Sequence, residues 1–173
     1  MTSKQFICPS RLFKDSFLLA RKIYASGYRP DILLVLWRGG APVGLVVHEF
    51  LAYKGLDVRQ IVIKVASYSG IGKRRRLRIR RFSNDFLRIK KKTQVLVVDD
   101  IYDSGETIKS VKARLSSETE NIKVATLYLR RGRRPGPDFY VREVSKWVVF
   151  PHEILDLTKS EIRKKSRFIS SLL

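Results

Sequence analysis

Three carboxylates follow a short apolar run near the middle of the chain, at Asp99, Asp100 and Asp103 in the stretch VLVVDDIYDSGET. Adjacent carboxylates repel each other, and at the end of a buried strand they are costly without partners. Two kinds of partner would satisfy them: a metal ion, or a vicinal diol whose hydroxyls donate hydrogen bonds to the carboxylate oxygens. The full run therefore indicates a binding site, whereas a single Asp would be explained as the end of a strand.

A turn of small residues comes directly after the acids and precedes a helical pattern. It joins Asp103 to Ser104, Gly105, Glu106 and Thr107. Backbone N–H groups exposed at the start of a helix, together with the helix dipole, suit an anion such as a phosphate. Carboxylates that bind a diol, next to N–H groups that bind a phosphate, predict a pocket for a ribose 5-phosphate.

Net charge is the most unusual property of the composition. The 173 residues include 36 Lys and Arg against 16 Asp and Glu, which gives a formal charge of +20. Such a charge favours anionic partners, either phosphates or nucleic acid. The single cysteine, Cys8, excludes an intrachain disulfide and a thiolate metal cluster, and the presence of only two histidines argues against a His-based zinc site.

The chain shows no apolar run long enough for a membrane helix, and its N-terminus lacks the apolar stretch of a signal peptide. We therefore expect a soluble cytoplasmic protein.

Strands and helices alternate through the first three quarters of the chain. Apolar runs predict strands at 31–36, 58–65, 94–98 and 122–129. Helical spacing predicts helices at 10–25, 42–54, 107–115 and 159–168. This order indicates an α/β fold with a parallel sheet flanked by helices, whose sites lie beyond the carboxyl ends of the strands. The rule selects four loops: 37–40, 67–83, 99–107 and 130–134.

The stretch VLVVDDIYDSGET resembles the phosphoribosyl-pyrophosphate-binding motif of the type I phosphoribosyltransferases. WRGGAPVG at 37–44 resembles their pyrophosphate loop, and Ser67-Tyr68 opens a segment similar to their flexible active-site loop. VATLYLR at 124–130 and KWVVFPHE at 146–153 resemble the purine-binding hood of the 6-oxopurine enzymes. The resemblance covers about residues 20–155. It implies one domain over residues 1–173, with a core at about 10–129, a hood at about 130–157 and a C-terminal helix.

This resemblance implies an activity, a cofactor and an assembly. The enzyme would transfer the 5-phosphoribosyl group of phosphoribosyl pyrophosphate to hypoxanthine or guanine, with xanthine as a further candidate. The products would be the purine nucleoside monophosphate and pyrophosphate, as in purine salvage. Mg²⁺ would be the cofactor, and the chain would form a homodimer or a homotetramer.

The resemblance also assigns roles at the sugar and phosphates. Asp99 and Asp100 would bind the ribose hydroxyls and Mg²⁺, the metal either directly or through water. Asp103 and the small-residue turn would hold the 5′-phosphate, and Asp103 would also lie near N7 of the base and accept a proton there. Residues that would contact the pyrophosphate are Arg38, Gly39, Gly40, Ser67 and Tyr68. A cis peptide is expected at Trp37–Arg38.

Four residues would form the base pocket by the same resemblance. Arg130 occupies the position of a Lys that donates to the purine O6, and a guanidinium also donates but as a planar fork. Trp147 would stack on the base, the Val148 backbone would read its edge, and Glu153 would accept from the 2-amino group of guanine. As alternatives, Arg130 is one surface arginine among basic neighbours and Trp147 is a core aromatic.

The basic stretch at 73–81 leaves several readings open. Its alternation at 76–80 fits one arm of a hairpin. It would be a lid over the substrate, an oligomer or effector contact, an RNA-binding segment or a solvated loop. Two functions remain as alternatives. One is an adenine phosphoribosyltransferase, in which a backbone carbonyl would accept from the 6-amino group in place of Arg130. The other is a non-catalytic regulator that keeps the pocket and binds nucleic acid through residues 73–81.

Overall fold

A computed structural model of the chain describes residues 4–68, 76–79, 89–155 and 157–173. Its main sheet has six strands in the order β4-β3-β2-β5-β6-β7. Neighbouring strands are parallel except β3 and β4, which are antiparallel. The bounds are β2 (Ile32–Trp37), β3 (Arg59–Tyr68), β4 (Arg76–Ile79), β5 (Val95–Tyr102), β6 (Ile122–Arg130) and β7 (Phe139–Val144).

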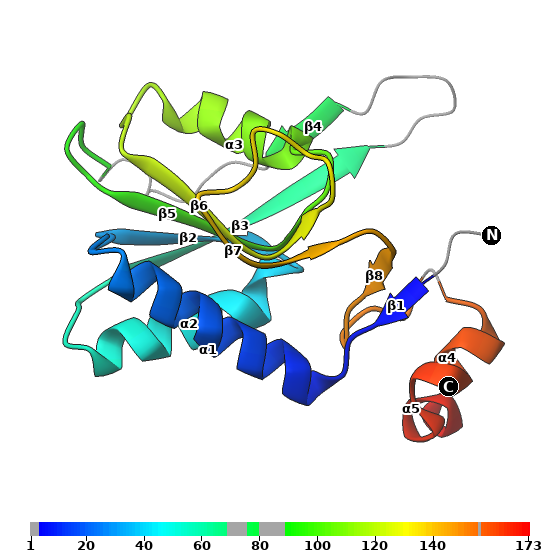
Figure 1. Cartoon of the computed structure of the whole chain (residues 1–173). Coiled ribbons are helices and arrows are strands. Elements are labelled where there is room, and N and C mark those ends of the chain that lie inside the picture. The colour runs from blue at the N-terminus through cyan, green and yellow to red at the C-terminus, as the bar shows by residue number, and fades with distance from the viewer. Residues whose placement is uncertain (1–3, 69–75, 80–88, 156) are drawn as a thin grey trace.

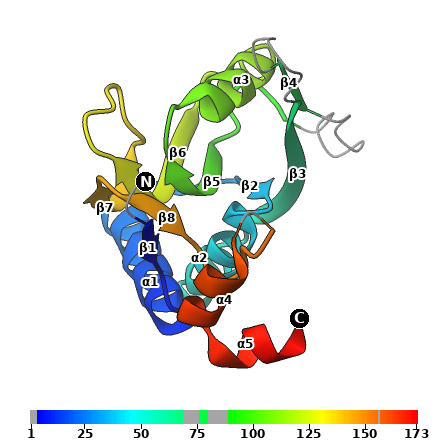
Figure 2. The same ribbon diagram turned by 90° about the vertical axis from the view of Figure 1, so that its right-hand side faces the viewer.

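Helices cover both faces of this sheet, as the alternation of elements predicts. Helices α1 (Pro9–Ala25) and α2 (Gly40–Tyr53) lie on one face, and α3 (Glu106–Leu115) lies on the other (Figures 1 and 2). Successive side chains of a strand point to opposite faces. Leu96 and Val98 of β5 therefore pack in the cluster beneath α1 and α2, whereas Val95 and Val97 pack in the cluster beneath α3.

Strand β5 extends further than the sequence pattern predicts. The apolar run ends at Val98, but pairing with β6 continues through Ile101 and Tyr102. Asp99 and Asp100 therefore lie inside the strand, where the backbone of the neighbouring strand fixes their positions. The antiparallel pairing of β4 with the end of β3 confirms a hairpin arm at 76–79. Residues 73–75 and 80–81 of the basic stretch lie outside the described residues.

A second, two-stranded sheet lies beyond the end of the main sheet to which the parallel strands point (Figure 1). It pairs β1 (Lys4–Phe6) in parallel with β8 (Trp147–Val149). Sequence reasoning missed β1, because three residues are too few to show a period. Strand β7, which the sequence places within the hood, pairs with β6 at the edge of the main sheet.

The prediction of one helix at 159–168 is wrong. The chain forms two short helices, α4 (Lys159–Lys165) and α5 (Arg167–Leu172). Ser166 separates them with an extended backbone (φ −163°, ψ 119°), and its side chain accepts a hydrogen bond from the Ile169 N–H. Ser166 therefore ends one helix and caps the next, which a helical spacing of apolar residues does not reveal. None of the helices described is both long enough and apolar enough to span a bilayer.

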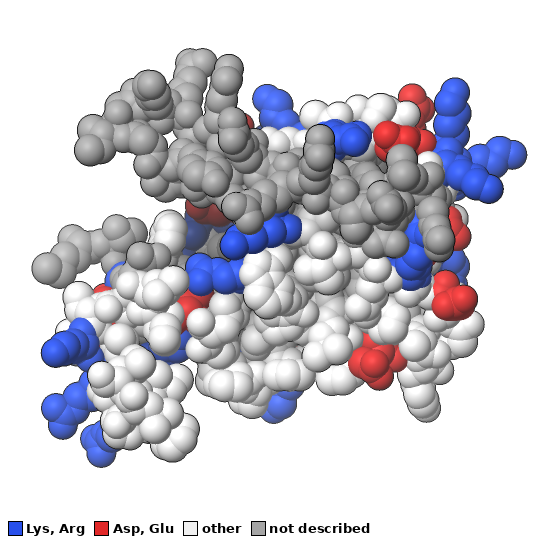
Figure 3. Space-filling view, turned by 180° about the vertical axis from the view of Figure 1, so that it is seen from behind, with Lys and Arg blue, Asp and Glu red and all other residues white. Residues whose placement is uncertain are grey.

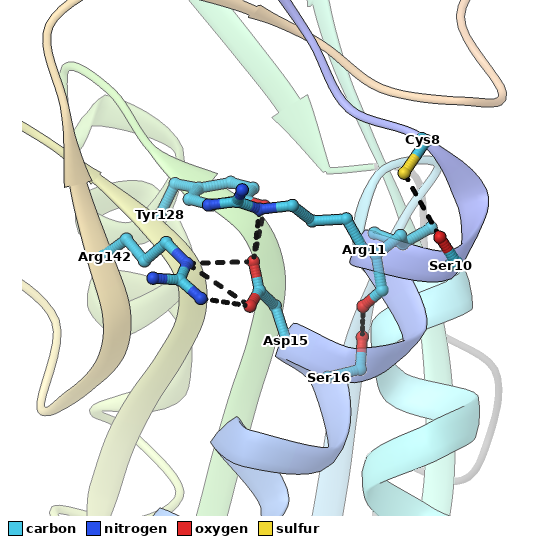
Figure 4. Close-up of polar contacts among 8 residues, drawn as sticks. Cys8, Ser10, Arg11, Asp15, Ser16, Tyr128 and Arg142 are labelled. Atoms are coloured by element: carbon cyan, nitrogen blue, oxygen red, sulfur yellow. Dashed lines mark hydrogen bonds and ion pairs between the residues drawn. The ribbon is translucent and has the colours of Figure 1, made fainter.

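A buried carboxylate joins α1 to the last strands of the main sheet (Figure 4). The Asp15 side chain accepts hydrogen bonds from the Tyr128 hydroxyl at 2.8 Å and from the Arg142 guanidinium at 3.0 Å, and Arg11 lies 3.5 Å away. Only 1% of Asp15 is exposed. Although burial opposes ionisation, the hydrogen bonds from Arg142 and Tyr128 hold the pKa of Asp15 below its ordinary value.

Replacing Asp15 with Ala should lower the free energy of unfolding by about 2–4 kcal/mol, because it leaves the buried Tyr128 hydroxyl without its acceptor and Arg142 without its partner. Asp15→Asn should lose less, since the amide oxygen still accepts from Tyr128. Urea unfolding at pH 7 measures both. The exposed neighbour Lys14→Ala is the control, and a loss no larger than that of the control would show that this cluster does not hold α1.

Candidate active site

The acid pair lies at the carboxyl end of β5, between β2 and β6. Alternation along the strand directs Asp100 toward the α2 face of the sheet and Asp99 toward the α3 face. The Asp99 carboxylate accepts a hydrogen bond from the backbone N–H of Asp100 at 2.9 Å. Asp100 is 7% exposed. The two carboxylates thus leave the end of one strand on opposite faces but line the same cavity, and little water reaches Asp100.

Burial makes these carboxylates difficult to ionise. It raises the pKa of Asp99 to about 7. It also raises the pKa of Asp100 well above its ordinary value, and the carboxylates of Asp99 and Glu153 add to that effect. A cation or a set of hydroxyl donors would relieve the cost. The acid pair is therefore suited to bind a cation or a set of hydroxyl groups.

The loop after β2 approaches the acid pair closely because it contains two glycines. A Cβ added to Gly39 would collide with the Asp100 carboxylate, and one added to Gly40 would collide with the Val98 carbonyl oxygen. The predicted cis peptide at Trp37–Arg38 is present. Only residues without a side chain allow the loop to lie against β5 in this way.

A cavity of about 510 Å³ joins these elements. It brings together many of the residues singled out in the sequence: Arg38, Gly39, Asp99, Asp100, Thr107 and Glu153. In the space-filling view from behind, acidic and basic side chains lie next to one another at a hollow in the surface (Figure 3). The cavity therefore combines carboxylates with cations, as a ligand with both hydroxyls and phosphates requires.

Two lining residues with titratable side chains escaped the sequence analysis. Lys64 lies within β3 and pairs in register with Trp37, the last residue of β2, and His152 belongs to the turn after β8. Lys64 interrupts the apolar run at 61–66, and that interruption was a usable signal. Nothing in the local sequence distinguishes His152. Ser67 and Tyr68 end β3, where they pair with Leu77 and Arg76 of β4.

Residues of the turn after β5 line two different cavities. Gly105 adopts φ +80°, and a Cβ there would collide with the Tyr102 hydroxyl. Thr107 lines the cavity of the acid pair, whereas Ser104, Gly105 and Glu106 line a separate cavity of about 630 Å³ beside the loop 132–136. The turn thus contributes residues to both cavities.

Asp103 and Arg130 form an ion pair across the ends of β5 and β6. The Arg130 Nε donates to the Asp103 carboxylate at 2.7 Å, and Nη1 donates to the Lys146 carbonyl. The Arg130 side chain is 15% exposed and that of Asp103 is 45% exposed. Arg130 is therefore not a free surface arginine, which sequence reasoning kept as an alternative.

The hood lies against the cavity through β8 and the turn that follows it. Trp147 is 51% exposed and Val148 is 5% exposed. Trp147 lines a small cavity of about 70 Å³, which it shares with Arg38 and Glu153. Because Arg38 and Glu153 also line the larger cavity, the two spaces adjoin. Trp147 thus presents an aromatic surface to the small cavity rather than filling the core.

Comparison with known proteins agrees with this geometry. Residues 11–156 match the family described as phosphoribosyl transferase domain. The xanthine-guanine phosphoribosyltransferase of Roseobacter denitrificans is 31% identical over 157 residues, which cover 83% of this chain and 82% of that protein. The chain therefore belongs to the phosphoribosyltransferase family.

Solved structures show the same fold. A purine phosphoribosyltransferase from Pyrococcus horikoshii superposes with a TM-score of 0.72 at 26% identity, over 90% of this chain and 97% of the other. The Helicobacter pylori xanthine-guanine-hypoxanthine phosphoribosyltransferase gives a TM-score of 0.68 at 22% identity, over 86% and 92% of the two chains.

The raised pKa values predict how stability depends on pH. Asp99 and Asp100 have higher pKa values in the folded protein than in the unfolded chain. The free energy of unfolding should therefore fall as pH rises from about 4 to about 7. Asp100→Asn removes one of these groups, so the variant should melt a few degrees above the wild type at pH 8 and close to it at pH 4. Calorimetry in EDTA measures this, and parallel profiles for the two proteins would contradict it.

Gly39→Ala should displace the Asp100 carboxylate and weaken binding of phosphoribosyl pyrophosphate with Mg²⁺ by about tenfold or more, because a misplacement of about 1 Å can cost as much as 100-fold. Titration calorimetry measures the affinity. Gly136→Ala is the matched control, since its Cβ would lie 3.3 Å from a side-chain methyl of Leu129 and would not approach the acid pair. Equal affinity in Gly39→Ala and wild type would show that the close approach is not needed for binding.

Proposed function

We propose that the protein transfers the 5-phosphoribosyl group of phosphoribosyl pyrophosphate to a 6-oxopurine, namely hypoxanthine, guanine or xanthine. The bond from C1′ to the pyrophosphate oxygen breaks, a bond from C1′ to a ring nitrogen of the base forms, and the base loses a proton. The observation that carries this proposal is the single cavity in which the acid pair meets Arg38 and Lys64. The similarity to the Roseobacter denitrificans enzyme supports the class of base.

The acid pair would hold the ribose and help to hold Mg²⁺. Within the described part of the chain, no group of three or more His, Cys, Asp or Glu could hold a metal. Two adjacent carboxylates nevertheless suit Mg²⁺, which commonly takes one or two carboxylates from a protein and its other ligands from substrate phosphates and water. When bound, the metal would neutralise charge on the pyrophosphate. Asp99 and Asp100 would accept hydrogen bonds from the 2′- and 3′-hydroxyls.

Arg38 and Lys64 would bind the pyrophosphate leaving group. Negative charge grows on the pyrophosphate as its bond to C1′ breaks, and donors already in place stabilise that charge most effectively. Arg38 follows the end of β2, Lys64 lies on the neighbouring strand β3, and both line the cavity with the acid pair. The backbone of Gly39 and Gly40 would add N–H donors. The 5′-phosphate would lie at the turn that contains Thr107.

The Asp103–Arg130 ion pair would face the imidazole ring and the 6-position of the base. Asp103 would accept a proton at N7, and Arg130 would donate to O6 while holding Asp103 in place. A guanidinium cannot accept a hydrogen bond, so it suits an oxo group and not the amino group of adenine. Trp147 would stack on the ring, the Val148 backbone would read its edge, and Glu153 would accept from a 2-amino group.

The assembly into a homodimer or a homotetramer stays a prediction. The exposed side chains Phe13, Phe17 and Leu18 of α1 would be covered by such a contact, since each is between 46% and 49% exposed.

Guanine, hypoxanthine, xanthine, adenine and uracil, each supplied with phosphoribosyl pyrophosphate and Mg²⁺, test the proposal. Guanine or hypoxanthine should give the nucleoside monophosphate and pyrophosphate, and adenine should not. Asp103→Asn should lower kcat by about 100-fold or more, the usual contribution of a general base. Chromatography of the labelled products measures both. Turnover of adenine alone, or of no base at all, would contradict the proposal.

A further inference from the structure

The turn from Phe150 to Glu153 carries side chains into the site from the hood. His152 and Glu153 line the main cavity, and Glu153 also lines the small cavity beside Trp147. One carboxylate oxygen of Glu153 accepts a hydrogen bond from the Phe150 N–H at 2.9 Å. The orientation of Glu153 therefore depends on the shape of this turn.

Lys165, the last residue of α4, holds both ends of the turn. Its Nζ donates to the Phe150 carbonyl oxygen at 2.7 Å and to the Glu153 carbonyl oxygen. An ammonium group carries three donors, so one side chain can bridge two carbonyls. Burial lowers the pKa of Lys165, and the Glu153 carboxylate opposes that effect. The lysine thus lies within the structure beside the turn, with its charge directed at the backbone.

One further contact joins α4 to the strand pair of the hood. Glu161, which also forms a capping box with Thr158 at the start of α4, pairs with Lys4 of β1 at 2.7 Å. Strand β1 pairs with β8, which contains Trp147. Helix α4 therefore contacts the strand pair on one side and the Phe150–Glu153 turn on the other. Both Lys4 and Lys165 lie outside the part of the chain that matches the family, residues 11–156.

We propose that Lys165 is a positioning residue for base recognition, which fixes the Phe150–Glu153 turn so that Glu153 faces the 2-position of the base. The inference rests on the proposed function. It also adds to that function, because it assigns selectivity between guanine and hypoxanthine to a helix beyond the family match. Only guanine of these two bases carries a 2-amino group, so a displaced Glu153 penalises guanine more.

Steady-state kinetics of Lys165→Met test this inference. Met keeps the apolar stem but leaves two carbonyls without their donor. We expect KM for guanine to rise by about tenfold, the equivalent of one strong hydrogen bond, while KM for phosphoribosyl pyrophosphate and KM for hypoxanthine change by less than about twofold. Lys165→Arg should retain most of the guanine affinity, because a guanidinium can donate to both carbonyls.

Lys164→Met is the matched control. Lys164 is exposed and forms no hydrogen bond or ion pair with the other described residues, so its replacement should leave all three KM values unchanged. If Lys165→Met fails to fold, Lys165→Gln, which can donate to one carbonyl, replaces it. Thermal melting accompanies each assay, because a purely structural lysine would lower the melting temperature without changing the ratio of the two base KM values.

A double-mutant cycle shows whether Lys165 acts through Glu153. In a Glu153→Ala background, Lys165→Met should no longer change KM for guanine, since the group that it positions is absent. Equal guanine and hypoxanthine effects of Lys165→Met in an active enzyme would overturn the inference and leave the proposed function intact. Failure of the wild type to turn over any base would instead overturn the proposed function.

Discussion

Two adjacent carboxylates inside the end of a central strand are the constraint on which the site depends. Pairing of β5 with β6 extends past Asp99 and Asp100, so neither side chain can turn away into water as it would on a loop. The neighbouring elements accommodate them in specific ways. Gly39 of the preceding loop leaves room for the Asp100 carboxylate. Burial raises the pKa of both acids, and this makes their ionised forms depend on what binds beside them.

The parallel sheet makes this accommodation possible because it gathers the carboxyl ends of several strands. β2 leads into Arg38, β3 contributes Lys64, and β6 ends at Arg130. The sheet is held to α1 by the buried Asp15 cluster, which joins the helix to β6 and β7. The hood is built differently, since α4 and β1 brace it from both ends of the chain.

The cis peptide after β2 is present, as the resemblance to the family implied. Sequence reasoning correctly placed the acids at the carboxyl end of a buried strand, although two of them lie inside the strand rather than after it. It failed where the outcome depends on tertiary contacts. The register of β3 against β2 places Lys64 in the cavity, and a strand as short as β1 forms only because β8 lies beside it. The break at Ser166 likewise depends on a cap that competes with helix continuation.

The high positive charge is divided among cations with different partners. Arg130 is paired with Asp103, and Lys165 is bound to backbone carbonyls. Within the residues that the structure describes, Arg38 and Lys64 form no such hydrogen bonds, although both line the cavity of the acid pair. Two cations of the site are thus committed to holding carboxylates and backbone in place, and two keep their donors for a ligand. Because phosphates require donors that are not already occupied, it is this division, rather than the net charge of +20, that suits the cavity to a phosphorylated sugar.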